Sequence, residues 1–493
     1  MGTNFTFIDL FSGIGGFHQG LSKHGGLCKG YSEINRDAIE TYCNNFNEKK
    51  ENNLGDITKI IKLPQHDILT AGVPCQSWSI AGKNLGFDDD RGELWNDTIY
   101  LLKQSQPKAF IFENVKGLVD PRNKKALTYI LERIKNAGYF ANFHIINSHD
   151  YGVAQNRIRV YIIGFREKRY FDAFKLPKPL EKKVKLADIL GVKIEEKSTP
   201  TKELDLFGNE IKSKNMSLSN TNGVNDYFLF NDLRNGDTTI HSWDILETTK
   251  RQKELCYLLL KNRRKSAYGK LDGNPLSLEH FQSLDATVKK EELEKLVELE
   301  IFREVDYLFS IIKEDRSNLS EAEKTLLNSA VENQIRLDEL KKNRTLKLKK
   351  VSIPKTISLL LEKNILKVEE LRYEFKNSKI STGLFGVNRI FLPTSDTFPT
   401  LVASDTNDYI TLKNIPHTSN YREEFLKEVY FKNAYRKITK SEACRIQGFP
   451  DDFKLPESRA RWMKLIGNSV SVPIIEVLVK AMLDTGLRGE ERF

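Results

Sequence analysis

The first 166 residues alternate short apolar runs with longer amphipathic stretches. Helical spacing of apolar residues marks the stretches 94–104 and 126–138. The runs rich in β-branched and aromatic residues, which predict strands, are 5–11, 27–31, 66–71, 108–114, 143–148 and 159–165. Strands that alternate with helices in this way predict an α/β fold with a doubly wound, mostly parallel, Rossmann-like sheet. Ligands of such sheets bind beyond the carboxyl ends of the strands.

The pattern changes after Arg166. Residues 245–345 have largely helical spacing, and within them the apolar positions of 291–312 predict one helix. The closing stretch 466–483 turns at Gly467-Asn468 and enters a helix that is apolar on almost every face, so it must be buried. We therefore expect one domain from 1–166 and 466–493, and a second, mixed domain from 167–465 that carries the helical segment.

Composition limits the class of protein. The 493 residues carry 77 Lys and Arg against 67 Asp and Glu, a net charge of +10, which permits a polyanionic partner without proving one. No apolar run approaches the roughly 18 residues of a membrane span, and the N-terminus lacks a secretory pattern. Five scattered cysteines without a Cys-x-x-Cys pair argue against disulfides and structural zinc and fit a reducing cytoplasm.

Eight scattered histidines offer no ligand cluster, so we expect no metal. The densest basic clusters are 261–265 and 341–350. We expect both to be solvated faces, unless the partner is a polyanion.

A glycine-rich turn follows the first predicted strand, in "FIDLFSGIGGFHQGL" (7–21). His18 stands where a dinucleotide fingerprint has its third glycine, and no phosphate-binding loop follows, so the turn suits a smaller nucleoside cofactor. Glu33 ends the second strand, where an acid can bind ribose hydroxyls, and Asp56 could accept the adenine amino group. A plain packing role for either acid stays equally open.

Cys75 follows Pro74 at the end of a predicted strand. Most single cysteines in soluble proteins fill the core, and this stretch alone does not exclude that. The neighbouring blocks change the picture. In chain order they are "DLFSGIGGF", "GVPCQSWS", "ENVKGL", "QNRIRVYIIGFR", "RKITKSEACRIQGFPDDF" and "GNSVSVPIIEVLV".

Together these blocks, within 1–166 and 431–485, resemble the ordered motifs of the DNA (cytosine-5)-methyltransferase family. The resemblance implies a methyl donor, S-adenosylmethionine, and a double-stranded DNA substrate whose target cytosine is flipped out. It makes 167–465 a target-recognition domain, and residues 76–91 a loop that closes over the base. A bacterial or phage-encoded, cytoplasmic monomer that acts beside a separate restriction endonuclease is the expected setting.

The chemistry of cytosine gives the motif residues their roles. C5 is a poor nucleophile, so a thiolate must first add to C6, and Cys75 is suited to that step. Addition pushes charge toward N3 and O2, which Glu113 and either Arg157 or Arg159 would stabilise. The resemblance also implies that Pro74 and Asn114 shape this site. The residues it implies for the cofactor site are Phe11, Ser12, Gly13, Ile14, Gly15, Gly16, Glu33, Ile34, Asp56, Ile57, Leu94, Asn468, Ser469 and Val470.

Three other classes compete with this interpretation. A nicotinamide oxidoreductase would use the same sheet, but it would have the third glycine. A tRNA cytosine-5 methyltransferase shares most of the motifs, but such relatives have a short target region and a Cys-Phe-Thr tripeptide, neither of which is found here. A catalytically inactive DNA-binding homologue would be expected to have lost Cys75 or Glu113.

Overall fold

The computed structural model describes residues 5–74, 94–194, 227–229, 239–313, 317–377, 383–416 and 420–487. Two compact units make up the chain. The first contains Met1–Tyr227 and Ile390–Phe493, and the second contains Phe228–Arg389. The division by function expected above, at 166/167 and 465/466, stays a prediction. The compact units have other bounds, because 167–227 and 390–465 make most of their contacts within the first unit.

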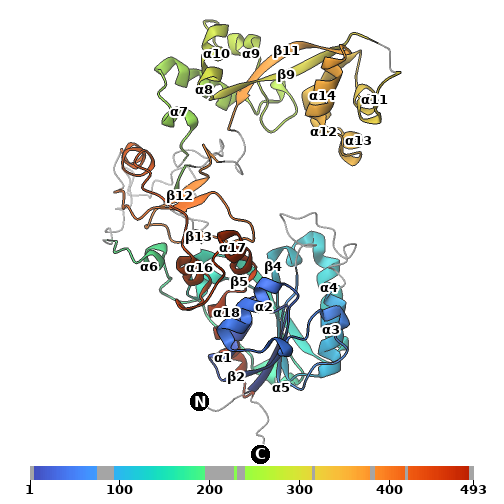
Figure 1. Ribbon diagram of the computed structural model, residues 1–493, viewed down its shortest axis with the longest axis vertical. Coiled ribbons are helices and arrows are strands. Elements are labelled where there is room, and N and C mark those ends of the chain that lie inside the picture. Colours follow the sequence, from blue (N-terminus) through green and yellow to red (C-terminus); the bar gives the residue numbers. More distant parts are fainter. Residues whose placement is uncertain are drawn as a thin grey trace, which may run out of the picture. The chain divides into compact units, whose positions relative to one another are not determined.

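A six-stranded sheet forms the centre of the first unit (Figure 1). In spatial order its strands are β2 (Gly26–Ser32), β1 (Phe5–Leu10), β3 (Ile68–Gly72), β4 (Ala109–Val115), β7 (Ile158–Phe165) and β5 (Phe140–Asn147). The first four run parallel, whereas β7 is antiparallel to both β4 and β5. The α/β class with a mostly parallel sheet is therefore confirmed. The parallel strands place their carboxyl ends at one edge.

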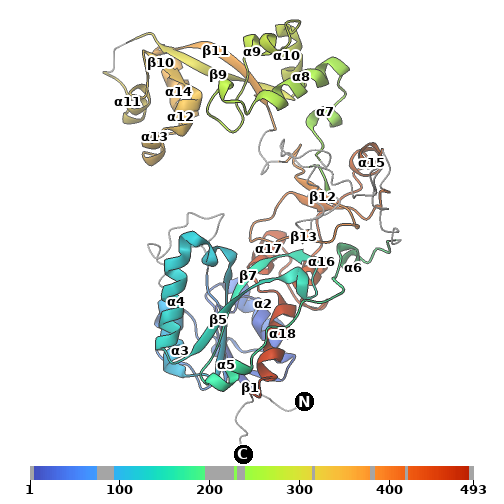
Figure 2. The same cartoon turned by 180° about the vertical axis from the view of Figure 1, so that it is seen from behind.

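Helices cover both faces of this sheet (Figure 2). They are α1 (Gly16–Ser22), α2 (Arg36–Phe46), α3 (Leu94–Ser105), α4 (Lys124–Asn136) and α18 (Val472–Leu483). One core joins Trp95 and Ile130 of α3 and α4 to the sheet, and another joins Phe17 and Ile475 of α1 and α18 to it. The C-terminal helix thus packs on the N-terminal domain, as its apolar pattern predicted.

Close packing of α1 against α18 depends on Gly20. A Cβ at this position would lie 2.7 Å from Cγ2 of Ile475, so only glycine lets the helices approach this far. We expected no segment fit to cross a membrane. Among the described residues, Arg459–Leu483 has the length and composition for one, but 67% of its apolar window is buried within the protein. The segment is also interrupted between Asn468 and Val472, so composition alone is weak support for a span.

Shorter elements complete the first unit, and two of them, β8 (Tyr227–Phe228) and β12 (Arg389–Phe391), lie across its boundaries with the second. The others are β6 (Gln155–Asn156), α5 (Lys168–Ala173), α6 (Leu186–Leu190), β13 (Phe398–Pro399), β14 (Asp408–Ile410), α15 (Tyr421–Phe425), α16 (Lys440–Gln447) and α17 (Arg459–Asn468). Parallel pairing of β13 with β6 brings Phe398 beside Gln155. This pairing places the following residues, Thr400 and Leu401, next to the start of β7.

The second unit has helices and a three-stranded sheet of order β10-β9-β11. Its elements are α7 (Ser242–Ile245), α8 (Lys250–Asn262), α9 (Leu278–Leu284), α10 (Lys290–Glu298), β9 (Phe302–Ile311), α11 (Glu321–Leu327), β10 (Gln334–Arg336), α12 (Leu337–Lys342), α13 (Arg344–Leu348), α14 (Ile353–Glu362) and β11 (Leu366–Phe375). The single helix predicted over 291–312 is wrong. Glu300 adopts a positive φ of 57°, and residues 302–311 form β9, antiparallel to β11. Their aromatic and β-branched residues favour a strand once a partner strand is available.

Candidate active site

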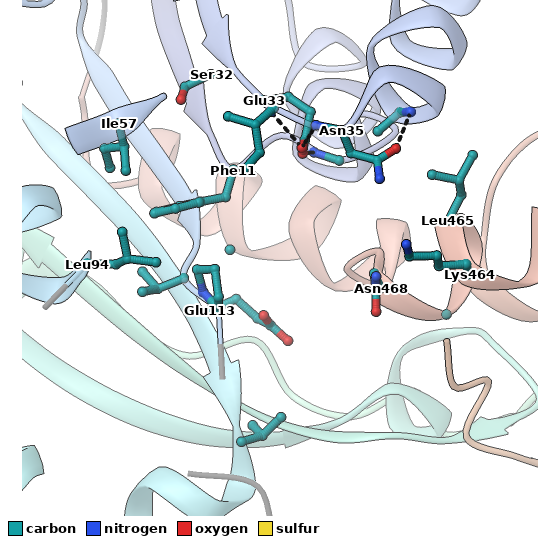
Figure 3. Close-up of a pocket in the computed structure, with 18 of the residues that line it drawn as sticks. Phe11, Ser32, Glu33, Asn35, Ile57, Leu94, Glu113, Lys464, Leu465 and Asn468 are labelled. Carbon is teal, nitrogen blue, oxygen red and sulfur yellow. Dashed lines mark hydrogen bonds between the residues drawn. The ribbon is translucent and has the colours of Figure 1, made fainter. Parts of the chain in front are cut away.

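A cavity of about 530 Å³ opens at the carboxyl edge of β1–β4 (Figure 3). Each of these four strands, or the residue that follows it, supplies part of the wall, as the strand-end rule predicted. The lining residues are Phe11, Gly13, Ser32, Glu33, Ile34, Asn35, Ala38, Gly55, Asp56, Ile57, Gly72, Val73, Pro74, Leu94, Glu113, Val115, Arg157, Arg159, Lys464, Leu465, Gly467 and Asn468.

Glu33 ties the glycine turn to the next βα connection. One of its carboxylate oxygens accepts a hydrogen bond from the backbone N–H of Gly13 at 2.9 Å. The other accepts from the N–H groups of Ile34 and Asn35, at 2.8 and 2.7 Å. Gly13 has a φ of 55°, a left-handed conformation that glycine adopts at low cost. The carboxylate oxygens together offer about four acceptor sites, so capacity remains for a ligand hydroxyl.

The cavity is also lined by a second carboxylate, that of Asp56, and by apolar side chains. Asp56 accepts hydrogen bonds from the N–H and hydroxyl of Thr58, at 3.1 and 2.9 Å, and these bonds lower the pKa of its carboxyl. Phe11, Ile57 and Leu94 also line the cavity (Figure 3). A flat ring with a polar edge fits such a surface.

Glu113 on β4 is the buried acid of the cavity. Burial raises the pKa of its carboxyl, and the nearby guanidinium of Arg159 acts in the opposite direction. Nε of Arg159 lies 3.1 Å from a carboxylate oxygen of Glu113, and both side chains are largely buried. The two residues come from neighbouring antiparallel strands, β4 and β7, whose pairing fixes their separation. The acid and the cation therefore form one rigid pair.

Arg157 has different partners from Arg159. Its guanidinium donates to the carbonyl of Leu401 at 3.0 Å, and to the carbonyls of Gly467 and Ser469 at 3.1 and 2.8 Å. Arg157 is 3% exposed, so these bonds lie in the protein interior. It thus joins the start of β7 to two segments that lie far away in the sequence. Of the two arginines considered for O2, Arg159 is the one that contacts Glu113.

Asn114 holds the chain that leads to the predicted nucleophile. Its side-chain amide donates to the carbonyl of Val73 at 3.2 Å, and its oxygen accepts from the N–H of Val115 at 2.8 Å. Asn114 is 1% exposed. Pro74 lines the cavity, whereas Cys75 and the loop 76–91 lie outside the described residues.

Several residues assigned to the cofactor by resemblance do not line the cavity. These are Ser12, Ile14, Gly15, Gly16, Ser469 and Val470. Gly16 shows what they do instead, because a Cβ there would lie 2.7 Å from both the Ser469 hydroxyl and a Val470 methyl. The glycine turn and the start of the last helix are thus packed against each other, and they support the wall from behind.

The sequence analysis missed several lining residues, of which Lys464 and Leu465 on α17 come from the far end of the chain. Lys464 is exposed, forms no ion pair with a described residue, and points its amine toward the open space near Asn468 (Figure 3). The last motif block begins at Gly467, three residues after Lys464, and therefore does not include it. A helical reading of the preceding residues would have placed Lys464 one turn before Asn468, on the same side.

One potential metal-ligand group occurs in the described part of the chain, contrary to our view that the histidines offer none. Ligand atoms of His18, Cys28 and Glu48 lie within 4.8 Å of one another. The hydroxyl of Tyr42 lies 2.7 Å from Nδ1 of His18 and 3.7 Å from the sulfur of Cys28, so these groups already have a polar partner. The metal-free expectation stays a prediction.

With this geometry in view, the comparisons with known proteins identify the class. The family profile of the C-5 cytosine-specific DNA methylases matches residues 5–304 and 286–484. The chain belongs to this family. It is a DNA cytosine methyltransferase whose methyl donor is S-adenosylmethionine.

Particular relatives match over nearly their whole length. The type II methyltransferase M.HgiBI of Herpetosiphon aurantiacus is 40% identical over 97% of this chain and 96% of its own. M.NlaIV of Neisseria lactamica, also a type II methyltransferase, is 30% identical over 97% of this chain and 99% of its own. Among solved structures, the S. pombe Dnmt2 methyltransferase is 13% identical with a TM-score of 0.43, covering 97% of this chain and 98% of that one.

Proposed function

We propose that this protein methylates C5 of a cytosine within a specific double-stranded DNA sequence, through a covalent adduct between Cys75 and C6 of a flipped-out base. We further propose that it protects DNA from a separate restriction endonuclease, as a bacterial or phage-encoded cytoplasmic monomer. The observation that carries the proposal is the Glu113–Arg159 pair, which shares one cavity with Pro74 and with the Glu33 and Asp56 walls.

The lining residues fit S-adenosylmethionine. Glu33 keeps acceptor capacity for ribose hydroxyls, Asp56 can accept the adenine amino group, and Phe11, Ile57 and Leu94 supply an apolar surface for the ring. When bound, this cofactor supplies an electrophilic methyl group. Lys464 forms no ion pair with a described residue, so its ammonium is the group we assign to the cofactor carboxylate.

Cys75, Glu113 and Arg159 are the residues that we propose activate the cytosine. The Cys75 thiolate forms the bond to C6, and the electron pair of the C5–C6 double bond becomes available at C5. Glu113 donates its proton to N3, which a buried carboxyl with a raised pKa can hold ready. Arg159, bound to the same carboxyl, donates to O2 and stabilises the charge there. After methylation a base removes the C5 proton, the C5–C6 double bond re-forms and the C6–S bond breaks with its electron pair returning to the cysteine sulfur. The proton on N3 returns to Glu113.

Asn114 has a positioning role in this scheme. Its amide fixes the Val73 carbonyl two residues before the nucleophile, so it limits where the cysteine backbone can lie. Base flipping costs a few kcal/mol whether or not chemistry follows. The position of the nucleophile affects the chemical step that follows flipping, and not the flipping itself.

Three experiments test the proposal. Bisulfite sequencing of DNA from cells that express the protein should reveal methylated cytosine in one sequence context, and purified tRNA should accept no methyl groups. DNA that carries 5-fluorocytosine at that site should form a covalent complex, because fluorine cannot leave as the proton does.

Cys75→Ser should lose both methylation and trapping but keep DNA affinity, since phosphate contacts come from other residues. Near wild-type methylation by Cys75→Ser would refute the adduct. Resistance of the methylated DNA to a co-encoded nuclease tests the protective role.

A further inference from the structure

The second unit carries a cluster of basic residues that methyl transfer, as proposed above, does not use. Residues 341–363 contain eight Lys and Arg against one acid, Glu362. We call six of them the basic cluster, and all six are exposed: Lys341, Lys342, Arg344, Lys347, Lys350 and Lys355. Like charges at this density repel one another, so the cluster costs free energy unless an anion or solvent compensates it.

The basic cluster has no acidic partner among the described residues. None of its six side chains forms an ion pair with a described residue. By contrast, Arg251 lies 2.7 Å from Asp285 and 3.0 Å from Glu292. Arg251 is therefore neutralised within the fold, whereas the cluster keeps its full charge for another molecule.

A folded support holds the cluster in place. The helices α12, α13 and α14 that carry it bury Leu340, Leu346 and Leu360, each no more than 1% exposed, in one hydrophobic core. Asn343 caps α13 by accepting hydrogen bonds from two backbone N–H groups. Both views show the three helices on the same side of the β9–β11 pair (Figures 1 and 2). The charges thus lie on a fixed surface. Such a surface loses less side-chain and backbone entropy on binding than a flexible basic tail would lose.

We propose that the basic cluster binds the phosphate backbone of the double-stranded DNA substrate. The inference rests on DNA being the substrate of this enzyme, and it adds the second unit to the surface that holds it. Lysine and arginine on a rigid face release counterions when they neutralise phosphates, which gives affinity without regard to base sequence. The cluster therefore contributes to affinity for every DNA, and recognition of the target sequence lies with other residues.

A charge-matched pair of variants of the full-length protein tests this role. The cluster variant carries Arg344→Gln, Lys347→Gln and Lys350→Gln. The control carries Lys175→Gln, Lys178→Gln and Lys182→Gln, three exposed lysines of the first unit that form no ion pair with a described residue. Both variants lose three positive charges. Fluorescence anisotropy then measures the Kd for target and non-target duplexes from 50 to 300 mM salt.

The cluster variant should bind both duplexes on the order of tenfold more weakly at 100 mM salt. Its plot of log Kd against log salt should be shallower by about 2 to 3, since each phosphate contact contributes about 0.9. The control should match wild type, and replacement of the three residues by the other basic residue (Lys for Arg344, Arg for the lysines) should retain wild-type binding. Equal binding by cluster variant and control, or a loss confined to the target duplex, would overturn the proposal.

A second measurement uses the wild-type protein, so it tests the proposal even if the cluster variant does not fold. Bound duplex DNA should protect Lys347 and Lys350 of the wild-type protein from acetylation, while Lys178 stays reactive. Equal modification with and without DNA, or equal protection by an acidic polypeptide at the same charge concentration, would also overturn it. Methylation by wild-type protein, measured in parallel, tests the enzymatic function separately.

Discussion

Asn114→Ala provides a direct test of how the active-site wall is built. The substitution removes the amide that donates to the Val73 carbonyl at 3.2 Å, in a site where the side chain is 1% exposed. A buried acceptor left without its donor costs about 1 to 3 kcal/mol, so we expect a loss of stability of that size in urea unfolding. The same loss removes a restraint on the chain just before Cys75, the proposed nucleophile.

The kinetic effect should exceed the effect on cofactor binding. A displacement of a reacting group by about 1 Å can slow a reaction about 100-fold, so the rate of methyl transfer in a single turnover should fall 10- to 100-fold. Cofactor affinity, measured by calorimetry, should change less than threefold, because Asn114 does not line the cavity.

A second buried asparagine offers a matched control. The side-chain amide of Asn123 donates to the carbonyl of Gly117 at 2.8 Å, but it lies outside the cavity wall. Asn123→Ala should lose a similar amount of stability and keep the rate of methyl transfer. If Asn114→Ala transfers methyl groups within twofold of wild type while stability falls as expected, the positioning role is refuted.

Three further changes test the supports of the site. Burial raises the pKa of Asp9 from 3.8 to about 8, so the folded protein binds this proton more tightly than the unfolded chain does. The stability that protonated Asp9 contributes is complete below pH 4 and is lost as pH rises to 8. Asp9→Asn should therefore be more stable than wild type by about 2 to 5 kcal/mol at pH 8 and not at pH 4, as pH-dependent urea unfolding can measure. Arg157→Met should cost about 2 kcal/mol or more in the same assay, because the buried carbonyls of Leu401 and Gly467 lose their donor, whereas the Ser469 carbonyl keeps the Gln447 amide. An unchanged stability with a lower kcat would instead favour contact with cytosine. Gly20→Ala should cost about 1 to 3 kcal/mol, because its Cβ would meet Ile475 at 2.7 Å, and an unchanged melting temperature would show that α1 and α18 can separate freely.

The sequence by itself determined the elements around the site. Apolar periodicity placed all six strands of the main sheet within a few residues, because each is a local pattern that ends at polar or glycine positions. Since parallel strands end at one edge, the same pattern also placed Glu33 and Glu113 around one cavity.

Only the tertiary structure decided which groups meet. Sequence spacing could not separate Arg157 from Arg159, since the choice depends on β4 pairing with β7 and on carbonyls some 244 to 312 residues away. It likewise missed β9, whose apolar spacing suits a helix until β11 supplies the partner strand. Hydrogen bonds and packing between distant segments leave no periodic trace in the chain, so the supports of the site and the partner of each polar group emerge only when the fold brings those segments together.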